Sequence, residues 1–209
     1  MKFIVHFIMF IYVNSIRKFF SFVSNFVYYK FIMKEDYLTK IKEEAHLIRT
    51  SDDVERLYKD YYKKYIYDPL YGFIDQSNTI DIIKYRGGGD CDDMAEVFRW
   101  LLSNYYYNKC NDPERIKKSV KIYAFFPITK HIIKAFKNCH VMCVVDRCTL
   151  NFAERPRWLL GDYGFYYYDS VDEVKQHYID RFFDSKDNIK IDDIVIVEVP
   201  SVDFLKLLV

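Results

Sequence analysis

The sequence predicts an α+β fold in which helices come first and an antiparallel sheet follows. Apolar residues recur at helical spacing in the first half of the chain, and runs rich in branched and aromatic residues fill the second half. Segregated helices and strands are typical of α+β proteins. Hydrophobic residues make up 51% of the 209 residues, which is enough for a packed core.

Composition limits the classes of function. The formal net charge is +1, so no overall field attracts nucleic acid, and we expect no nucleic-acid partner. Five cysteines form an odd number without a dense framework, which favours free thiols in a reducing compartment such as the cytoplasm. We expect neither a cofactor nor a metal.

Residues 1–34 differ from the rest, because they contain five basic residues and no acid among two aromatic, apolar runs. The first run, Phe3 to Val13, is 11 residues long, whereas a bilayer span needs about 20. We favour an interfacial helix that lies on a membrane surface or a partner. Packing on its own domain and membrane insertion are the alternatives. Residues 35–209 are expected to form the folded domain.

The helical half carries clear start and stop signals. Thr50 and Asp53 form a capping box, and three glycines, Gly87–Gly89, are expected to end a short helix. Helices are expected over residues 34–50, from 51 towards 65, over 80–85, and from 91 to about 107.

The second half is expected to form strands. A capping box of Ser170 and Glu173 opens one further helix, from about Val171 to Phe183. The four expected strands are VKIYAFF, NCHVMCVVD, RWLLGDYGFYYY and IDDIVIVEV.

Cys91 stands at the start of the helix that follows the glycines. It shares a helix face with Ala95, Phe98 and Leu102, and Asp90 is the expected cap. The helix N-terminus favours a thiolate there, so Cys91 is a candidate nucleophile. A buried structural cysteine is the alternative interpretation.

A nucleophilic cysteine needs a base, and His140 opens the strand HVMCVVD. Alternation along the strand puts His140 on one face and Cys139 and Cys143 on the other. A zinc site made from these three residues is therefore disfavoured.

The base needs an orienting group, and Asp162 is the better candidate. Asp146 lies on the strand of His140 but about 20 Å along it. A symmetrical loop centred on Asn151 would place Asp162 directly opposite His140. The alternative is that Asp162 is a turn residue of the segment GDYG.

Cys91, His140 and Asp162, in that chain order, lie in the segments GGGDCDD, CHVMCVVD and RWLLGDYG. This arrangement resembles the transglutaminase-like cysteine-enzyme superfamily, which includes microbial transglutaminase-like peptidases. The resemblance covers roughly Ser51 to Tyr168. It implies a papain-like fold with a cysteine helix packed on an antiparallel sheet.

The resemblance also implies roles. Cys91 would attack an amide carbonyl, His140 would carry the proton, and Asp162 would hold the imidazole. Gln76 falls near the oxyanion site, where family members often have an aromatic residue. Hydrolysis of a peptide or protein substrate is the favoured function, since no EF-hand calcium loop is present. Acyl transfer to an amine and a non-catalytic binding module at a membrane are the alternatives.

Overall fold

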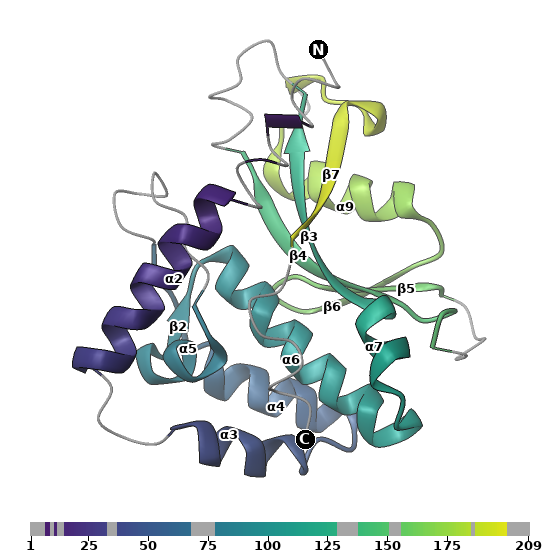
Figure 1. Cartoon of the computed structure of the whole chain (residues 1–209). Coiled ribbons are helices and arrows are strands. Elements are labelled where there is room, and N and C mark those ends of the chain that lie inside the picture. Colours follow the sequence, from purple (N-terminus) through teal and green to yellow (C-terminus); the bar gives the residue numbers. More distant parts are fainter. Residues whose placement is uncertain are drawn as a thin grey trace.

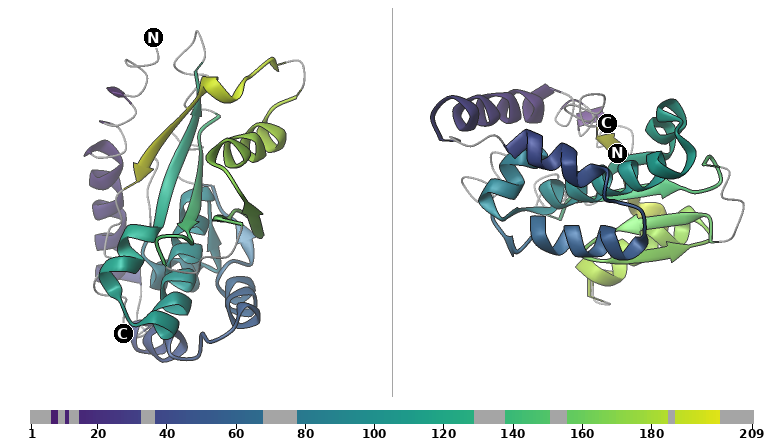
Figure 2. Two further views of the ribbon diagram at one scale, coloured as in Figure 1. Left: turned by 90° about the vertical axis from the view of Figure 1, so that its right-hand side faces the viewer. Right: turned by 90° about the horizontal axis from the view of Figure 1, so that it is seen from below.

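The computed structural model describes residues 7–8, 11, 15–32, 37–67, 78–128, 138–150, 156–184 and 187–199. An antiparallel sheet of five strands carries a long helix on one face and a shorter one on the other (Figures 1 and 2). The predicted α+β class is confirmed, as is the packing of the helix that begins at Cys91 against the sheet. The boundary between residues 1–34 and 35–209 stays a prediction.

The helices follow the expected order. The capping boxes at Thr50 and Ser170 are both present. Asp90 occupies the N-cap position before Cys91, but its side chain does not make the expected capping hydrogen bond. The helical elements are α2 (Arg17–Val27), the π-helical turn η2 (Tyr28–Ile32), α3 (Tyr37–Ala45), α4 (Ser51–Tyr61), α5 (Ile80–Arg86), α6 (Cys91–Cys110), α7 (Pro113–Ser119), α9 (Val171–Phe182) and the 3₁₀ turn η4 (Ile191–Asp193).

The sheet has the order β6-β5-β4-β3-β7, with every neighbouring pair antiparallel. Its strands are β3 (Val120–Pro127), β4 (His140–Asp146), β5 (Trp158–Gly161), β6 (Phe165–Tyr168) and β7 (Ile194–Val199). The segment RWLLGDYGFYYY is two strands rather than the single expected one. Tyr163 adopts a left-handed φ of 52°, and the Asp162 N–H donates to the Gly164 carbonyl at 3.0 Å, which closes a turn.

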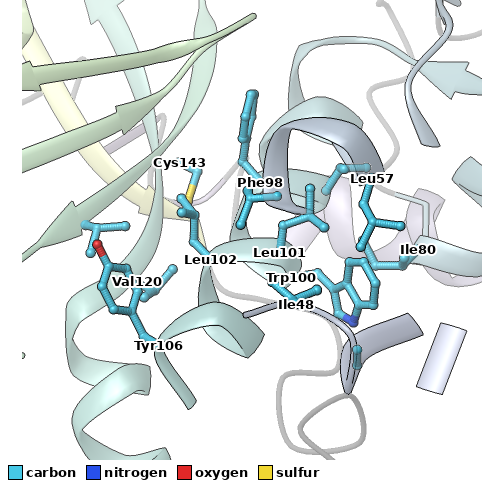
Figure 3. Packing of buried hydrophobic residues seen from close by; sticks show 14 of the residues in the cluster. Ile48, Leu57, Ile80, Phe98, Trp100, Leu101, Leu102, Tyr106, Val120 and Cys143 are labelled. Carbon is cyan, nitrogen blue, oxygen red and sulfur yellow. The ribbon is translucent and has the colours of Figure 1, made fainter. Parts of the chain in front are cut away.

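Alternation along the central strands divides the core into two layers. One face of β3 and β4 packs against α6, where Phe98, Trp100 and Leu101 are buried with Cys143 (Figure 3). The other face presents Met142 to a cluster that includes Val174 and Tyr178 of α9. The period of two predicted from the sequence therefore holds along β4.

The glycine triplet joins α5 to α6 in an unexpected way. Helix α4 ends at Tyr61, short of the expected Tyr65, and Lys64–Tyr65 form a strand, β1, that pairs in parallel with β2, Gly88–Gly89. A Cβ atom at Gly88 would lie 1.9 Å from the Lys64 carbonyl oxygen. Only glycine permits this close approach.

Candidate active site

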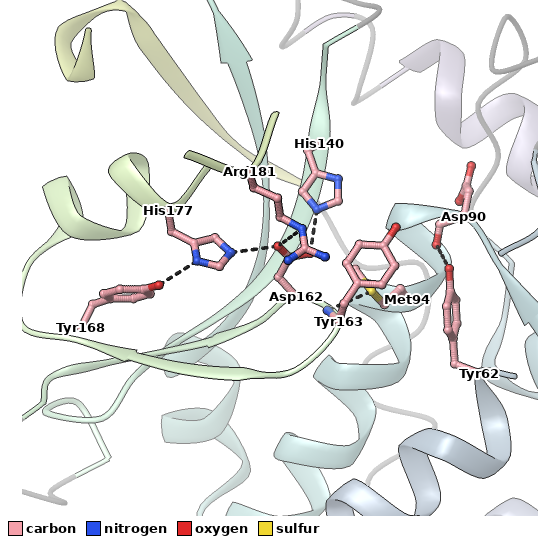
Figure 4. A network of polar contacts seen from close by, with 9 residues as sticks. All are labelled: Tyr62, Asp90, Met94, His140, Asp162, Tyr163, Tyr168, His177 and Arg181. Carbon is pink, nitrogen blue, oxygen red and sulfur yellow. Dashed lines mark hydrogen bonds and ion pairs between the residues drawn. The ribbon is translucent and has the colours of Figure 1, made fainter. Parts of the chain in front are cut away.

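His140 and Asp162 form a buried pair. His140 is the first residue of β4, and Asp162 follows the last residue of β5. The Nε2 atom of His140 lies 2.8 Å from Oδ1 of Asp162, and the two residues are 3% and 0% exposed (Figure 4). The predicted contact between them is confirmed.

The register that produces this contact differs from the expected one by two residues. Val144 pairs with Leu160 and Asp146 with Trp158, so extension of the ladder places Asp162 opposite Met142 rather than His140. A shift of two residues keeps a side chain on the same face of the sheet. The pair is therefore diagonal, a separation that a long side chain such as histidine spans.

Asp162 receives two more donors from α9. The Nε2 atom of His177 lies 3.0 Å from Asp162 Oδ2, and the Nε atom of Arg181 lies 3.4 Å from the same oxygen. The other ring nitrogen of His177, Nδ1, lies 2.7 Å from the Tyr168 hydroxyl. Both carboxylate oxygens are thus engaged, each by at least one histidine.

These partners keep Asp162 ionised. Burial alone raises the pKa of this carboxyl group, because it disfavours the charged form. Hydrogen bonds from His140 and His177, together with the charges of His140 and Arg181, outweigh burial and lower its pKa to about 2. Asp162 is therefore an anion at neutral pH, and the Nε2–H group of His140 donates to it.

Sequence reasoning missed His177 and Arg181 as parts of the site. They are four residues apart, so they lie on one face of a helix. That spacing was visible in the sequence. Nothing local in it indicated that this face of α9 would lie against the end of β5.

Aromatic rings surround the imidazole of His140. The ring of Phe182 lies 4.2 Å from it between centroids, and the ring of Tyr163 lies parallel to it at 6.2 Å. The guanidinium group of Arg181 covers Tyr163 at 4.7 Å. These side chains exclude water from one side of the pair, which strengthens its electrostatic interaction.

Helix α6 meets this group at its first turn. The Tyr163 N–H donates to Met94 Sδ at 3.3 Å (Figure 4). Cys91, the first residue of α6, is half-buried and packs against the cluster that contains Val141, the neighbour of His140. Burial raises the pKa of Tyr163, and the charges of Cys91 and Asp162 add to this rise. The contact between Cys91 Sγ and His140 stays a prediction.

The other cysteines are placed differently. None of the five forms a disulfide bond. Cys143 is buried on the α6 side of the sheet, away from the His140–Asp162 contact, and burial raises its pKa. Cys148 is exposed in the turn after β4. Asp146 bonds Thr149 at 3.0 Å in that same turn and Arg157, just before β5, at 2.9 Å. Its carboxylate therefore holds the loop between β4 and β5 rather than the histidine.

Three acids gather at the start of α6. Among the described residues, Asp90, Asp92 and Asp93 are the only cluster of three or more side chains that could ligate a metal ion. One carboxylate oxygen from each lies within 4.8 Å of the others. Asp93 is bound by the backbone and side chain of Asn78 and faces Arg86 at 3.6 Å. Burial, followed by the charge of Asp92, raises the pKa of Asp90. Asp93 thus ties α6 to α5 and to the segment that precedes α5.

Gln76, the predicted oxyanion residue, lies outside the described residues, and its role stays a prediction. The backbone N–H of Cys91 lies in the first turn of α6, where amides lack partners within the helix.

Comparison of the chain with protein-family models, with curated proteins and with solved structures finds no match.

Proposed function

We propose that the protein is a thiol-dependent amide hydrolase in which Cys91, His140 and Asp162 act as a triad. The observation that supports this most is the buried contact between His140 Nε2 and Asp162 Oδ1. It leaves the Nδ1 atom of His140 as the basic nitrogen. Among the described residues, none forms a hydrogen bond with this nitrogen, and the other contacts of the ring are with Tyr163 and Phe182.

The reaction would proceed in two halves. Cys91 Sγ attacks the carbonyl carbon of the amide while its proton passes to Nδ1 of His140. The tetrahedral intermediate collapses, the C–N bond breaks, and the leaving amine takes that proton, which leaves a thioester on Cys91. Water then attacks the thioester, again with Nδ1 as the base, and the acid product and the thiol are released.

Each supporting residue has a place in this scheme. Asp162 fixes the tautomer of His140 and stabilises the imidazolium that forms. His177 and Arg181 are positioning residues, since both contact Asp162 and act through it. The Cys91 backbone N–H, with Gln76, would bind the oxyanion. The helix on the sheet and the chain order of the three residues agree with the papain-like arrangement that the resemblance implies.

Reaction of the full chain with iodoacetamide at pH 6 to 7, followed by mass spectrometry, tests the proposal. Cys91 should react about tenfold or more faster than Cys148, an exposed thiol that serves as the internal reference. His140→Ala should bring the rate at Cys91 down to that of Cys148. Labelling of Cys91 no faster than Cys148 in the unmodified protein would remove the basis for catalysis.

The choice between hydrolysis and acyl transfer is made by the acceptor. A peptide amide substrate and a primary amine, supplied together, separate the two outcomes. Free acid as product supports hydrolysis, and amine incorporated into the product supports transamidation. Cys91→Ala is the control, because it should abolish both products.

A non-catalytic binding module is the second candidate, and the acids around Cys91 favour it. Asp90 and Asp92 flank the cysteine on both sides, and negative charge opposes a thiolate. Uniform, slow alkylation of the accessible cysteines would support this second candidate.

A further inference from the structure

Helix α2 turns its polar side inward and its apolar side outward. Ser21 and Asn25 are 1% and 7% exposed, whereas Phe22 and Phe26 are 69% and 53% exposed. A surface helix of a water-soluble domain has the opposite arrangement, with its apolar stripe facing the core. The apolar side chains that α2 and η2 expose are Phe19, Phe22, Val23, Phe26, Val27, Phe31 and Ile32.

Contacts with the domain hold this orientation. The Tyr29 hydroxyl lies 2.7 Å from Thr79 Oγ1 and donates to Asp81 Oδ1 at 2.9 Å. The guanidinium group of Arg86 lies 6.0 Å from the centre of the Tyr28 ring. Figures 1 and 2 show α2 along the outside of the molecule. The apolar face is therefore presented outward by the packing of the helix.

The charge of the N-terminal segment is of one sign. Residues 1–34 include Lys2, Arg17, Lys18, Lys30 and Lys34 and no acid, although the whole chain is close to neutral. Lys30, within η2, is exposed. An apolar, aromatic stripe accompanied by basic residues is complementary to a surface in which apolar acyl chains lie beneath anionic headgroups. Contiguous exposed apolar patches mark interaction sites, unlike single exposed residues.

The same helix is unsuited to cross a membrane. Among the residues that the structure describes, no helix combines the length and the apolar character that a membrane span requires. We propose that α2 and η2 form a docking surface for an anionic phospholipid bilayer, on which the helix lies flat with its phenylalanines in the interface. This inference does not depend on the proposed catalysis.

Co-sedimentation of the full chain with vesicles tests the proposal. Vesicles of neutral phosphatidylcholine are compared with vesicles in which about a third of the lipid is phosphatidylglycerol. Binding is expected to the anionic vesicles and should weaken as salt rises. Phe22→Ser with Phe26→Ser should weaken partitioning roughly tenfold or more for each phenylalanine. Lys30→Gln should weaken binding to the anionic vesicles roughly fivefold and leave binding to neutral vesicles unchanged.

The matched control is Leu47→Ser with Val171→Ser, which removes two exposed apolar side chains outside residues 1–34. This variant should bind as the unmodified protein does. Equal loss in the control, or equal binding to neutral and anionic vesicles, overturns the proposal. So does a dimer that binds no vesicles and dissociates when Phe22 and Phe26 are replaced, because the face would then contact a second copy of the chain.

Discussion

Asp162 has two roles that the sequence presents as alternatives. It is a turn residue, since its N–H donates to the Gly164 carbonyl, and it is also the partner of His140. Its two oxygens are divided between opposite sides, with His140 on Oδ1 and the two α9 residues on Oδ2. The turn thus fixes the carboxylate between a strand and a helix.

Asp162→Asn should therefore affect both stability and reactivity. The asparagine side chain carries no charge, and its NH2 group would face one of the N–H groups that now donate to Asp162. We expect the free energy of unfolding to fall by about 3 kcal/mol, the range for breaking one partner of a buried ion pair. The rate of alkylation of Cys91 should fall about a hundredfold or more, because the imidazole of His140 is no longer held in the tautomer that keeps Nδ1 unprotonated. Urea unfolding and mass spectrometry measure the two effects.

Asp146→Asn is the control for that substitution. Its carboxylate bonds Arg157 and Thr149 near the surface, away from His140. Alkylation of Cys91 should be unchanged, and the loss of stability should be about 1 kcal/mol or less. A loss of Cys91 reactivity equal to that in Asp162→Asn would contradict the assignment of Asp162 as the orienting residue.

Stability should also depend on pH through Asp162. Its folded pKa, about 2, is below the ordinary value of 3.8, so ionisation favours the folded state. The contribution, about 2 kcal/mol, is complete above about pH 5 and is lost as pH falls through 3.8 towards 2. Urea unfolding of the unmodified protein and of Asp162→Asn at several pH values measures it. A difference between the two proteins that stays constant from pH 6 to pH 3 would contradict this prediction.

At the scale of elements, the start of α6 is fixed by the glycines before it. Gly87 ends α5 in a left-handed conformation, with φ of 70°, and Gly88 passes against the backbone of β1. The pairing of β1 with β2 connects the end of α4 to the residue before Asp90. The position of Cys91 thus depends on a contact that has no room for a side chain.

Gly88→Ala and Gly87→Ala should therefore differ sharply. At Gly88 the new methyl group would meet the Lys64 carbonyl oxygen, so we expect a loss of about 3 kcal/mol or more and slower alkylation of Cys91. At Gly87 a Cβ atom would have nothing within 4 Å, so we expect the free energy of unfolding to fall by only about 1 kcal/mol, the cost of the left-handed conformation for alanine. Urea unfolding measures both. Equal effects would mean that the β1–β2 contact does not position α6.

At the scale of the whole molecule, the N-terminal segment should be separable from the fold. A chain that begins at Lys34 loses the hydrogen bonds from Tyr29 to Thr79 and Asp81. We expect it to stay folded by circular dichroism, with about 1–2 kcal/mol less stability. It should also lose vesicle binding. Aggregation or unfolding of the shortened chain would show that residues 1–33 belong to the core.

Local patterns were sufficient to predict much of the fold. Capping residues located the starts of α4 and α9, and alternation assigned His140 and Cys143 to opposite faces of β4. These features depend on neighbours in the sequence, which is why the residues alone identified them. The pairing of His140 with Asp162 was predicted from a symmetrical loop centred on Asn151, and it forms although the register differs by two residues.

The missed features depend on contacts between distant segments. The parallel pairing of β1 with β2 arises because Gly88 permits the backbone of Lys64 to approach closely. No sequence pattern in Lys64–Tyr65 predicts a strand. The inclusion of His177 and Arg181 depends on the direction in which α9 docks on the sheet. The exact register depends on the loop between β4 and β5, whose shape periodicity does not describe.

That register has a consequence for how the site tolerates changes in chain length. The expected pairing was two residues away from the real one, and the carboxylate still reached the imidazole. Insertions or deletions of two residues between Asp146 and Trp158 would preserve the side of the sheet on which Asp162 emerges. A register shift of a single residue would instead direct the carboxylate towards α6. Related chains that keep this chemistry should therefore keep the spacing from Trp158 to Asp162 along β5, while the loop before it varies in length.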